Sequence, residues 1–328
     1  MTFRLPFVAL VLFAGLLTAV SAQETRSYTA ANGTFDIPVA PQRIVALNDQ
    51  IVALPLYELG APVVGSAGRT DAEGNHFLRG GMDTLGIDYA NTGMGYVGGF
   101  NGLDVEAIAA LEPDLIIGGP YTDPAVAEQL QSVAPTLIIN NAELGLIETI
   151  RALADVSGKT GNFEARLQRY RDNIARTRGY IGNSEEVSVT LTFMFPAAEE
   201  LWVYRHGGNL GAITQVVRDL GFKETAPIAA LPTNEVTFSP ELIQDLDADF
   251  VFGFYRQQPD ATPATVLAAY EKFAPGWCLA LTACQNGQFV LLPGPTFGTT
   301  MAGLDLALEL VEGHVAGRPF TPFDEGQQ

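Results

Sequence analysis

Arginine and aromatic residues stand directly after several short apolar runs that predict buried strands. Arg69 follows the run at 63–65, Tyr121 follows the run at 116–117, and Phe297 follows the run at 290–292. Open α/β sheets bind ligands outside the carboxyl ends of their strands, so we expect these side chains around one site. Guanidinium groups form charge-assisted hydrogen bonds with anionic oxygens, and aromatic faces pack on flat or cationic groups. The pattern predicts a site for a planar, anionic, catechol-like ligand with these contacts: Arg69, Tyr96, Tyr121, Trp202, Tyr204, Arg205, Tyr255, Arg256 and Phe297. Each residue also has a structural alternative, a surface ion pair for the arginines and a core position for the aromatic residues.

The sequence lacks the patterns that would indicate an enzyme. The segment 93–98 has the glycine spacing of a dinucleotide-binding fingerprint, but no buried strand precedes it and no helix follows at once. Neither a metal-ligand spacing nor a Gly-x-Ser-x-Gly motif occurs. His76, His206 and His314 are isolated from one another and from any cysteine. We therefore expect neither an enzyme nor a protein-bound metal. The alternative of another class is an exported metal-dependent enzyme that uses these histidines.

Composition argues against nucleic acid as a partner. The chain has 328 residues, 47% of them hydrophobic, and its 37 acidic residues against 18 basic ones give a formal charge of -19. Such a surface repels phosphate backbones, and no cluster of lysine or arginine offsets it. The length indicates two domains, at roughly 150 residues per domain.

Residues 1–22 have the three parts of a secretory signal peptide. Arg4 supplies the positive region, 7–20 is almost wholly apolar, and small residues precede Gln23. The apolar run is short for a bilayer span, which makes a membrane anchor the less favoured alternative. No cysteine lies near the cleavage site, and no later run reaches about 18 apolar residues. We expect a soluble periplasmic protein after cleavage near Ala22.

The chain has two cysteines, Cys278 and Cys284. In an oxidising compartment, they predict a disulfide. A continuous helix would hold Cα atoms six residues apart at about 9 Å, beyond disulfide reach. A bridge therefore requires the helix to stop before Cys284, which the turn-forming residues at 285–287 favour. Two buried free thiols are the alternative, and either role is structural.

One α/β unit occurs twice in the chain. The segments 103–118 and 238–253 align without a gap, and each predicts a capped helix, a turn and a buried strand. Asp104 and Ser239 are the expected N-caps, and Glu106 and Glu241 follow in the first turn, where the helix dipole favours anions. A strand at 43–47, a helix at 50–59 and a strand at 61–65 imply a parallel sheet. We predict an α/β fold of two Rossmann-like lobes with parallel-type sheets.

Apolar residues recur at spacings of three and four between Phe163 and Ile181. This periodicity predicts one amphipathic helix of about 20 residues, near 30 Å long. A single long helix is stiff, so we expect a hinge of small amplitude between the lobes. The predicted organisation is a signal peptide at 1–22, an N-terminal lobe at 23–157, an interlobe helix at 158–182 and a C-terminal lobe at 183–328, with the ligand cleft between the lobes.

The chain resembles the periplasmic ferric-siderophore-binding proteins of ABC importers, most closely those for ferric enterobactin. The resemblance rests on the segments 61–66, 76–79, 105–117, 129–130, 134–140 and 277–290. It implies a monomer that captures a ferric siderophore, with a catecholate type favoured, and delivers it to an ABC permease on the periplasmic face of the inner membrane. Siderophore oxygens would fill the coordination of the iron, so we expect no cofactor. Haem or a corrinoid on the same fold is the alternative ligand.

The resemblance also implies a role for the paired glutamates of the repeat. In this family, one glutamate on each lobe engages basic pockets of the permease, and Glu106 and Glu241 occupy the matching positions. Stabilisation of the helix N-terminus, about 0.3–1 kcal/mol each, is the simpler alternative. The chain departs from the family at 297–299, where Phe297-Gly298-Thr299 stands in place of an arginine that follows the final strand in the closest relatives.

Overall fold

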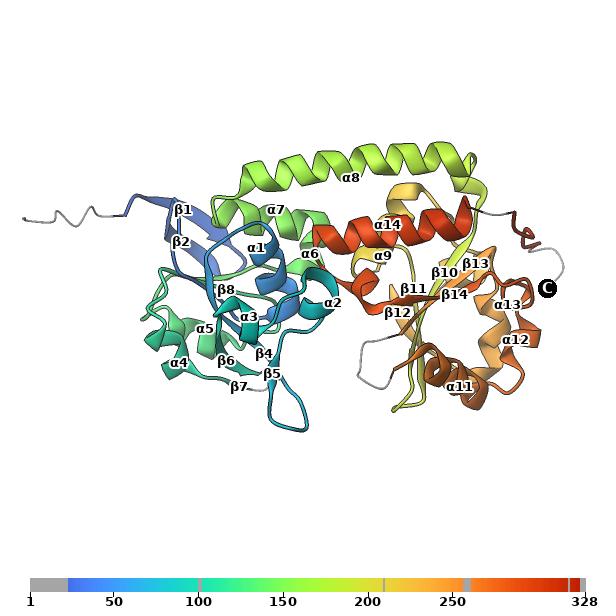
Figure 1. The fold of residues 1–328 in the computed structure, drawn as a ribbon, viewed down its shortest axis with the longest axis horizontal. Coiled ribbons are helices and arrows are strands. Elements are labelled where there is room, and N and C mark those ends of the chain that lie inside the picture. Colours follow the sequence, from blue (N-terminus) through green and yellow to red (C-terminus); the bar gives the residue numbers. More distant parts are fainter. Residues whose placement is uncertain (1–22, 100–101, 209, 256–260, 318, 325–328) are drawn as a thin grey trace, which may run out of the picture.

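The structure is a computed structural model that describes residues 23–99, 102–208, 210–255, 261–317 and 319–324. Two α/β lobes lie side by side, and helix α8 (Thr160–Ile181) runs along one side of both (Figure 1). This arrangement confirms the predicted fold class. The predicted signal peptide at 1–22 and Arg256 lie outside the described residues. In the described part of the chain, no helix is both long and apolar enough to span a membrane.

The N-terminal lobe contains a small antiparallel hairpin and one larger sheet. The hairpin pairs β1 (Thr25–Ala30) with β2 (Gly33–Pro38). The larger sheet has the order β7-β6-β4-β3-β8-β9, with β5 paired to β4. Its core strands are parallel, and only β5 and β7 pair in the antiparallel sense. Its strands are β3 (Ile44–Ala46), β4 (Val63–Thr70), β5 (His76–Phe77), β6 (Gly95–Gly99), β7 (Gly102–Leu103), β8 (Leu115–Gly118) and β9 (Thr136–Ile138).

Short helices follow most strands of this lobe. They are η1 (Asp49–Ala53), α1 (Leu54–Glu58), α2 (Gly81–Leu85), α3 (Tyr89–Thr92), α4 (Val105–Ala110), α5 (Pro124–Leu130), α6 (Asn141–Leu144) and α7 (Leu146–Val156). The helix predicted at 50–59 is divided, because residues 50–53 belong to the π-helical turn η1 before Pro55 enters the first turn of α1. Proline fits that position, where its missing N–H group leaves no helical bond unmade.

The C-terminal lobe has a mixed sheet in the order β12-β11-β10-β13-β14. Strands β10, β13 and β14 are parallel, whereas β11 and β12 return in the antiparallel sense. The carboxyl end of β11 therefore lies beside the beginning of β10. The strands are β10 (Val189–Phe195), β11 (Glu200–Tyr204), β12 (Glu235–Phe238), β13 (Phe250–Tyr255) and β14 (Phe289–Pro293). The helices are η2 (Ser184–Glu186), α9 (Ala212–Leu220), α10 (Ala226–Ala229), η3 (Pro240–Leu246), α11 (Pro263–Phe273), α12 (Trp277–Ala280), α13 (Thr282–Gln285), η4 (Gly294–Phe297) and α14 (Met301–Val315).

The two copies of the sequence repeat differ at their helices. Asp104 caps α4, because its carboxylate accepts a hydrogen bond from Ala107 N at 2.9 Å. Ser239 stands at the same place before η3, but its side chain makes no cap bond and the helix is of the 3₁₀ type. Asp247 follows η3 and accepts hydrogen bonds from Thr282 N and Ala283 N. The end of η3 is thereby tied to α13.

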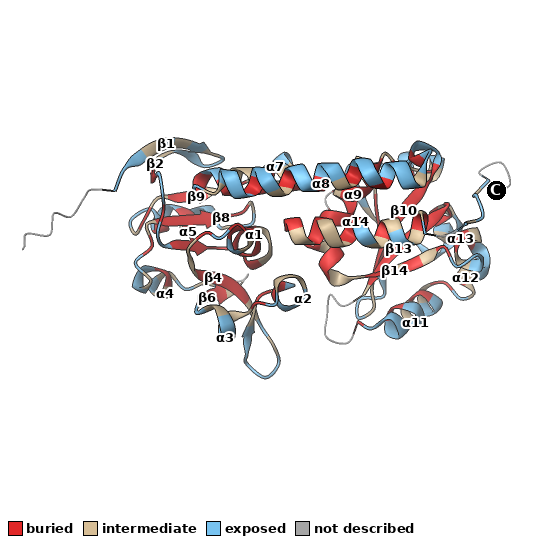
Figure 2. Cartoon of the chain, turned by 45° about the horizontal axis from the view of Figure 1, so that its top comes forward, coloured by how far each residue is buried: buried red, intermediate tan, exposed pale blue. Residues whose placement is uncertain are grey.

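A continuous apolar core joins the two lobes. The buried face of α8 consists of the residues Phe163, Leu167, Tyr170, Ile174 and Thr177. Figure 2 shows buried and exposed stretches alternating along this helix. Leu59 of the N-terminal lobe, Ile150 of α7 and Leu308 of α14 belong to the same buried cluster. Lobes that share a large apolar interface move less than lobes joined only by a linker.

Cys278 and Cys284 form a disulfide, with their Cα atoms 5.2 Å apart. The helix breaks at Leu281, whose backbone is extended between α12 and α13. The break therefore falls earlier than the turn at 285–287 had suggested. It brings the two cysteines within reach of each other.

Candidate ligand-binding cleft

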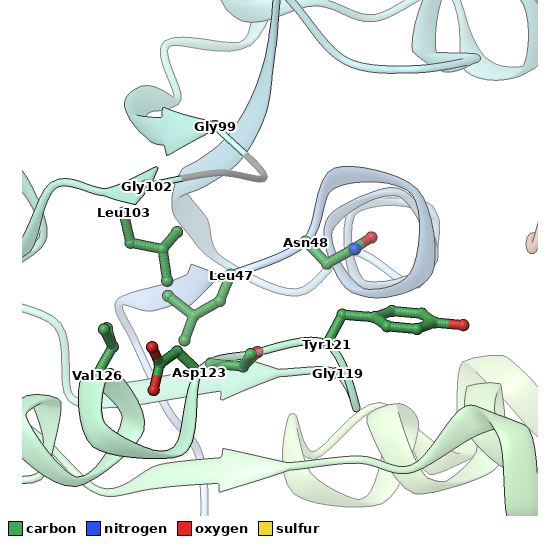
Figure 3. Close-up of a pocket in the computed structure, with 10 residues that line it drawn as sticks. Leu47, Asn48, Gly99, Gly102, Leu103, Gly119, Tyr121, Asp123 and Val126 are labelled. Atoms are coloured by element: carbon green, nitrogen blue, oxygen red, sulfur yellow. The ribbon is translucent and has the colours of Figure 1, made fainter.

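A pocket of about 240 Å³ opens at the carboxyl ends of the N-terminal sheet. Leu47 and Asn48 follow β3, Gly99 ends β6, and Gly119 follows β8 (Figure 3). The chain leaves β3 toward β4 on one side, and β8 lies on the other side, so the pocket lies where the strand order reverses. That is the usual ligand position in open α/β sheets.

A second pocket, of about 320 Å³, lies between the lobes. Gln50, Ile51 and Asn141 line it from the N-terminal lobe, and Phe297 and Thr299 line it from the C-terminal lobe. Tyr121 lines both pockets and is 68% exposed. In Figure 3, its ring extends away from Leu47 and Leu103. The two pockets therefore meet at one exposed aromatic side chain.

Arg69 is half-buried near the end of β4, close to a buried ion pair. Arg79 holds Asp49 with Nη2 at 2.6 Å from Oδ1, and Asp49 is 1% exposed. Burial lowers the pKa of Arg69, the Arg79 charge lowers it further, and the Asp49 charge opposes both effects. Because the pKa of a guanidinium group is above 12 in water, Arg69 still carries its charge at neutral pH. Arg69 lines neither of the two pockets, so its contact with a ligand stays a prediction.

Tyr96 lies on β6 beside Arg69, and a histidine covers one face of its ring. The His76 and Tyr96 rings stack at 3.7 Å with an interplanar angle of 5°. Thr70 Oγ1 lies 3.0 Å from His76 Nδ1 and 3.4 Å from the Tyr96 hydroxyl. Tyr89 approaches the same ring edge-on at 5.7 Å. Tyr96 therefore has little free aromatic face, and the exposed His76 ring is the outer member of the stack.

Aromatic side chains gather at the carboxyl ends of the parallel strands in the C-terminal lobe. Phe195 ends β10, Phe254 and Tyr255 end β13, and Phe297 ends η4. Phe193 links the group, at 4.3 Å from Phe195 and 5.4 Å from Phe297 between ring centroids. Trp202 on β11 meets Phe195 at 6.4 Å. These residues form an apolar wall that suits flat ligand groups.

Sequence reasoning missed some of these contacts. His76 was assigned only to the alternative of a metal-dependent enzyme, and Phe195 and Phe254 were not singled out. All three had a signal in the sequence. His76 lies seven residues after Arg69 across a turn, and the two phenylalanines stand in segments rich in apolar and aromatic residues at 189–195 and 250–255.

Tyr204 and Arg205 lie away from the carboxyl ends of the parallel strands, because β11 is antiparallel to its neighbours. Tyr204 pairs with Leu191 near the beginning of β10 and is buried. The Arg205 guanidinium lies 3.2 Å from Glu224. Neither residue lines the two pockets described above, although the backbone of Gly207 lines the interlobe pocket.

The remaining titratable candidates lie apart. Glu106 and Glu241 are both exposed, in the first turns of α4 and η3. Hydrogen bonds from its own backbone N–H and from the Ser239 hydroxyl lower the pKa of Glu241. His206 is buried between the carbonyl oxygens of Phe222 and Val189. Among the described residues, no three His, Cys, Asp or Glu side chains are placed to hold a metal ion.

Comparisons with known proteins identify relatives of the whole architecture. The Fe(3+) dicitrate-binding periplasmic protein FecB of Escherichia coli (strain K12) is 29% identical over 55% of this chain, which is 61% of its own length. The ferric enterobactin-binding periplasmic protein FepB of Escherichia coli O6:H1 is 25% identical over 88% of this chain and 90% of its own. The solved structure of the FhuD protein from S. pseudintermedius matches with a TM-score of 0.70 at 20% identity, over 90% of this chain and all of that one.

A family model described as "Periplasmic binding protein" matches residues 95–296. The matched region begins at β6 and ends within η4, so it includes α8, most of the C-terminal lobe, Tyr121 after β8 and Tyr255 at the end of β13. The chain belongs to the periplasmic binding protein family.

Proposed function

We propose that this protein captures a ferric siderophore in the interlobe cleft and delivers it to an ABC permease. The observation that carries the proposal is Tyr121, which lines both the strand-end pocket and the interlobe pocket with most of its side chain exposed. A ligand that contacts both lobes would meet it first. The relatives named for ferric dicitrate and ferric enterobactin support this class of ligand.

Catecholate siderophores are the favoured type within this class. Arg69 supplies a cation for the anionic iron centre, and the wall formed by Phe195, Trp202, Tyr255 and Phe297 suits flat rings. The oxygens of the siderophore would complete the iron coordination, so the protein would need no cofactor and no metal ligand of its own. Haem or a corrinoid is the competing ligand class, since both contain a flat macrocycle.

Delivery is proposed to use the exposed carboxylates of Glu106 and Glu241, with the protein acting as a monomer in the periplasm after signal-peptide cleavage. One carboxylate stands on each lobe, at the first turn of corresponding helices. Such a pair would engage two basic pockets of a permease at once, and each contact would remain exposed to salt screening.

Tryptophan fluorescence tests the ligand class. Trp202 is a half-buried member of the aromatic wall, whereas Trp277 is buried against Tyr270 and Phe289. In a Trp277→Phe variant, quenching of the remaining Trp202 should report on the cleft alone. We expect saturable quenching by the gallium complex of enterobactin at low micromolar concentration, and weaker quenching by ferrioxamine B, ferric citrate, haem and cobalamin. Gallium replaces iron in this ligand because light absorption by the ferric complex would itself lower the fluorescence signal, even without binding.

A matched pair of tyrosine variants locates the binding site. Tyr121 and Tyr180 are similarly exposed, but Tyr180 lies on α8. Tyr121→Ala should weaken binding at least tenfold, and Tyr180→Ala should leave it unchanged. Saturable binding of haem or cobalamin without any ferric or gallium siderophore binding would overturn the proposal.

A further inference from the structure

Glu58, the last residue of α1, has a nearly buried carboxylate with partners on two other elements. Its side chain is 2% exposed. Oε2 accepts a hydrogen bond from Met301 N at 2.8 Å, and Oε1 accepts one from Ala302 N at 2.7 Å. Arg166 Nη1 lies 3.0 Å from Oε1. Burial raises the pKa of Glu58, and Arg166 and the two amides oppose that rise.

These partners belong to three different parts of the fold. Glu58 is in the N-terminal lobe, Arg166 is on the bridging helix α8, and Met301 and Ala302 begin α14 of the C-terminal lobe. Figure 1 shows α14 running beneath α8, with its first turn toward the N-terminal lobe. One carboxylate therefore connects both lobes and the helix that bridges them.

The first turn of α14 needs a partner of this kind. The first amides of a helix have no acceptor within the helix. The hydroxyl of Thr300, the N-cap residue, accepts a hydrogen bond from Gly303 N at 3.0 Å. Glu58 serves the two amides that remain, and its negative charge is favoured at the helix N-terminus. The same helix would otherwise lose two buried hydrogen bonds.

Both ends of this connection continue directly into the interlobe pocket. Phe297 and Thr299 line the pocket just before α14, and Gln50 and Ile51 line it in η1, just before α1. The Thr299 hydroxyl donates to the carbonyl oxygen of Gln50 across the gap. A shift of α14 relative to Glu58 therefore changes the distance between the two walls of the pocket.

We propose that Glu58 is a positioning residue that fixes the orientation of the lobes and so the width of the ligand cleft. Its ion pair with Arg166 fixes the position of the N-terminal lobe relative to α8. Its hydrogen bonds with Met301 N and Ala302 N fix the start of α14, which follows the C-terminal wall of the pocket. This role adds to the proposed capture of a ferric siderophore, but its main test needs no ligand.

Pulsed electron spin resonance between two nitroxide labels measures the lobe orientation directly. Glu128→Cys on α5 and Ala268→Cys on α11 provide exposed labelling sites on the two lobes, at residues that line neither of the two pockets. Glu58→Ala should shift or broaden the distance distribution of the ligand-free protein. Glu58→Gln, which keeps one acceptor, should give a smaller change and serves if the alanine variant fails to fold. Arg151→Met is the matched control, because it removes ion pairs with Glu148 and Glu164 that do not involve the C-terminal lobe.

Distributions for Glu58→Ala or Glu58→Gln that superimpose on that of the parent, despite a lower melting temperature, would overturn the inference and leave only a stabilising role. The second measurement is the affinity for the gallium complex of enterobactin. We expect Glu58→Gln to weaken it at least threefold while Arg151→Met leaves it unchanged. Should the parent protein bind no siderophore at all, the proposed function would fail, and the distance measurement would still decide the role of Glu58.

Discussion

Arg79 and Asp49 form a bidentate ion pair behind the N-terminal wall of the cleft. Arg79 donates from Nε and Nη2 to the carboxylate, and its backbone N–H donates to Oδ2 at 2.9 Å. The pair joins the start of η1 to the segment before α2. The two opposite charges of the pair compensate each other, and both act on the nearby Arg69 guanidinium, whose pKa the Arg79 charge lowers and the Asp49 charge raises.

Loss of the Asp49 charge should destabilise the protein and disturb Arg69. Asp49→Asn leaves the Arg79 charge without its partner in a half-buried site, which typically costs about 3 kcal/mol in the free energy of unfolding. The double variant Asp49→Asn/Arg79→Met removes both charges and should recover part of that loss. Urea unfolding checks both values. A double variant no more stable than Asp49→Asn would contradict this account of the ion pair.

Arg69 and Arg205 should behave as opposites, although the sequence suggested the same role for both. Arg69→Met should weaken binding of the gallium complex of enterobactin by roughly tenfold or more, because a charge-assisted hydrogen bond contributes about 1.5–3 kcal/mol. Arg205→Met should leave the affinity unchanged and lower stability by at most about 1 kcal/mol, since its pair with Glu224 is partly exposed. Fluorescence titration and urea unfolding separate the two effects. Equal losses of affinity would mean that Arg205 reaches the ligand.

The strand-end rule explains which predicted residues the structure brings to the two pockets. Tyr121 and Phe297 line them, because β8 and β14 each belong to a parallel set whose carboxyl ends share one edge of a sheet. Tyr204 does not line them, because β11 runs the other way. Strand direction depends on pairing between distant segments, and the local pattern of apolar residues is the same in both directions.

Contacts between lobes were also beyond reach of local patterns. The periodicity between Phe163 and Ile181 predicted the long helix, and the structure has it at Thr160–Ile181. Glu58 carried no signal, because a glutamate at a helix end is ordinarily solvent-exposed. Its partners Met301 and Ala302 are more than 240 residues away in the chain. Such a pairing is a property of the assembled core.

Stability should fall as the pH drops from 7 toward 5, in part through His206. Burial lowers the pKa of His206 and outweighs the Val189 carbonyl and Glu224, which raise it. In the unfolded chain, a histidine takes up a proton near its ordinary pKa of about 6.5. Below that pH the unfolded state binds more protons than the folded state, so the free energy of unfolding decreases, by up to about 1.4 kcal/mol per pH unit. Urea unfolding at several pH values should show a smaller decrease in His206→Gln. Equal slopes in both proteins would contradict the assignment.

Gly211 should tolerate no side chain, because it packs against the segment that carries Phe297. Its φ angle is 67°, and an added Cβ atom would lie 2.1 Å from the Phe297 carbonyl oxygen. Gly276 has a similar φ angle of 76° with no atom within 4 Å, which makes it a matched control. Gly276→Ala should cost about 1–2 kcal/mol from backbone strain alone. Gly211→Ala should cost more and also weaken ligand binding, by displacing Phe297 from the aromatic wall. Urea unfolding and fluorescence titration measure the stability and the affinity of both variants. Equal losses in Gly211→Ala and Gly276→Ala would refute this prediction.

Glu106 and Glu241 should matter for uptake and not for affinity. Both carboxylates are exposed, and neither lines the pockets of the cleft. Alanine at either position should reduce uptake of a ferric siderophore by cells that carry the matching permease, and the double variant should abolish it. The affinity of the purified protein should remain unchanged, and stability should fall by only about 0.3–1 kcal/mol per site, the usual value for an acidic residue in the first turn of a helix. Glu128→Ala, an exposed carboxylate on α5, is the control for loss of charge alone. Normal uptake by the double variant would exclude docking through these residues, and a weakened affinity would place them at the ligand.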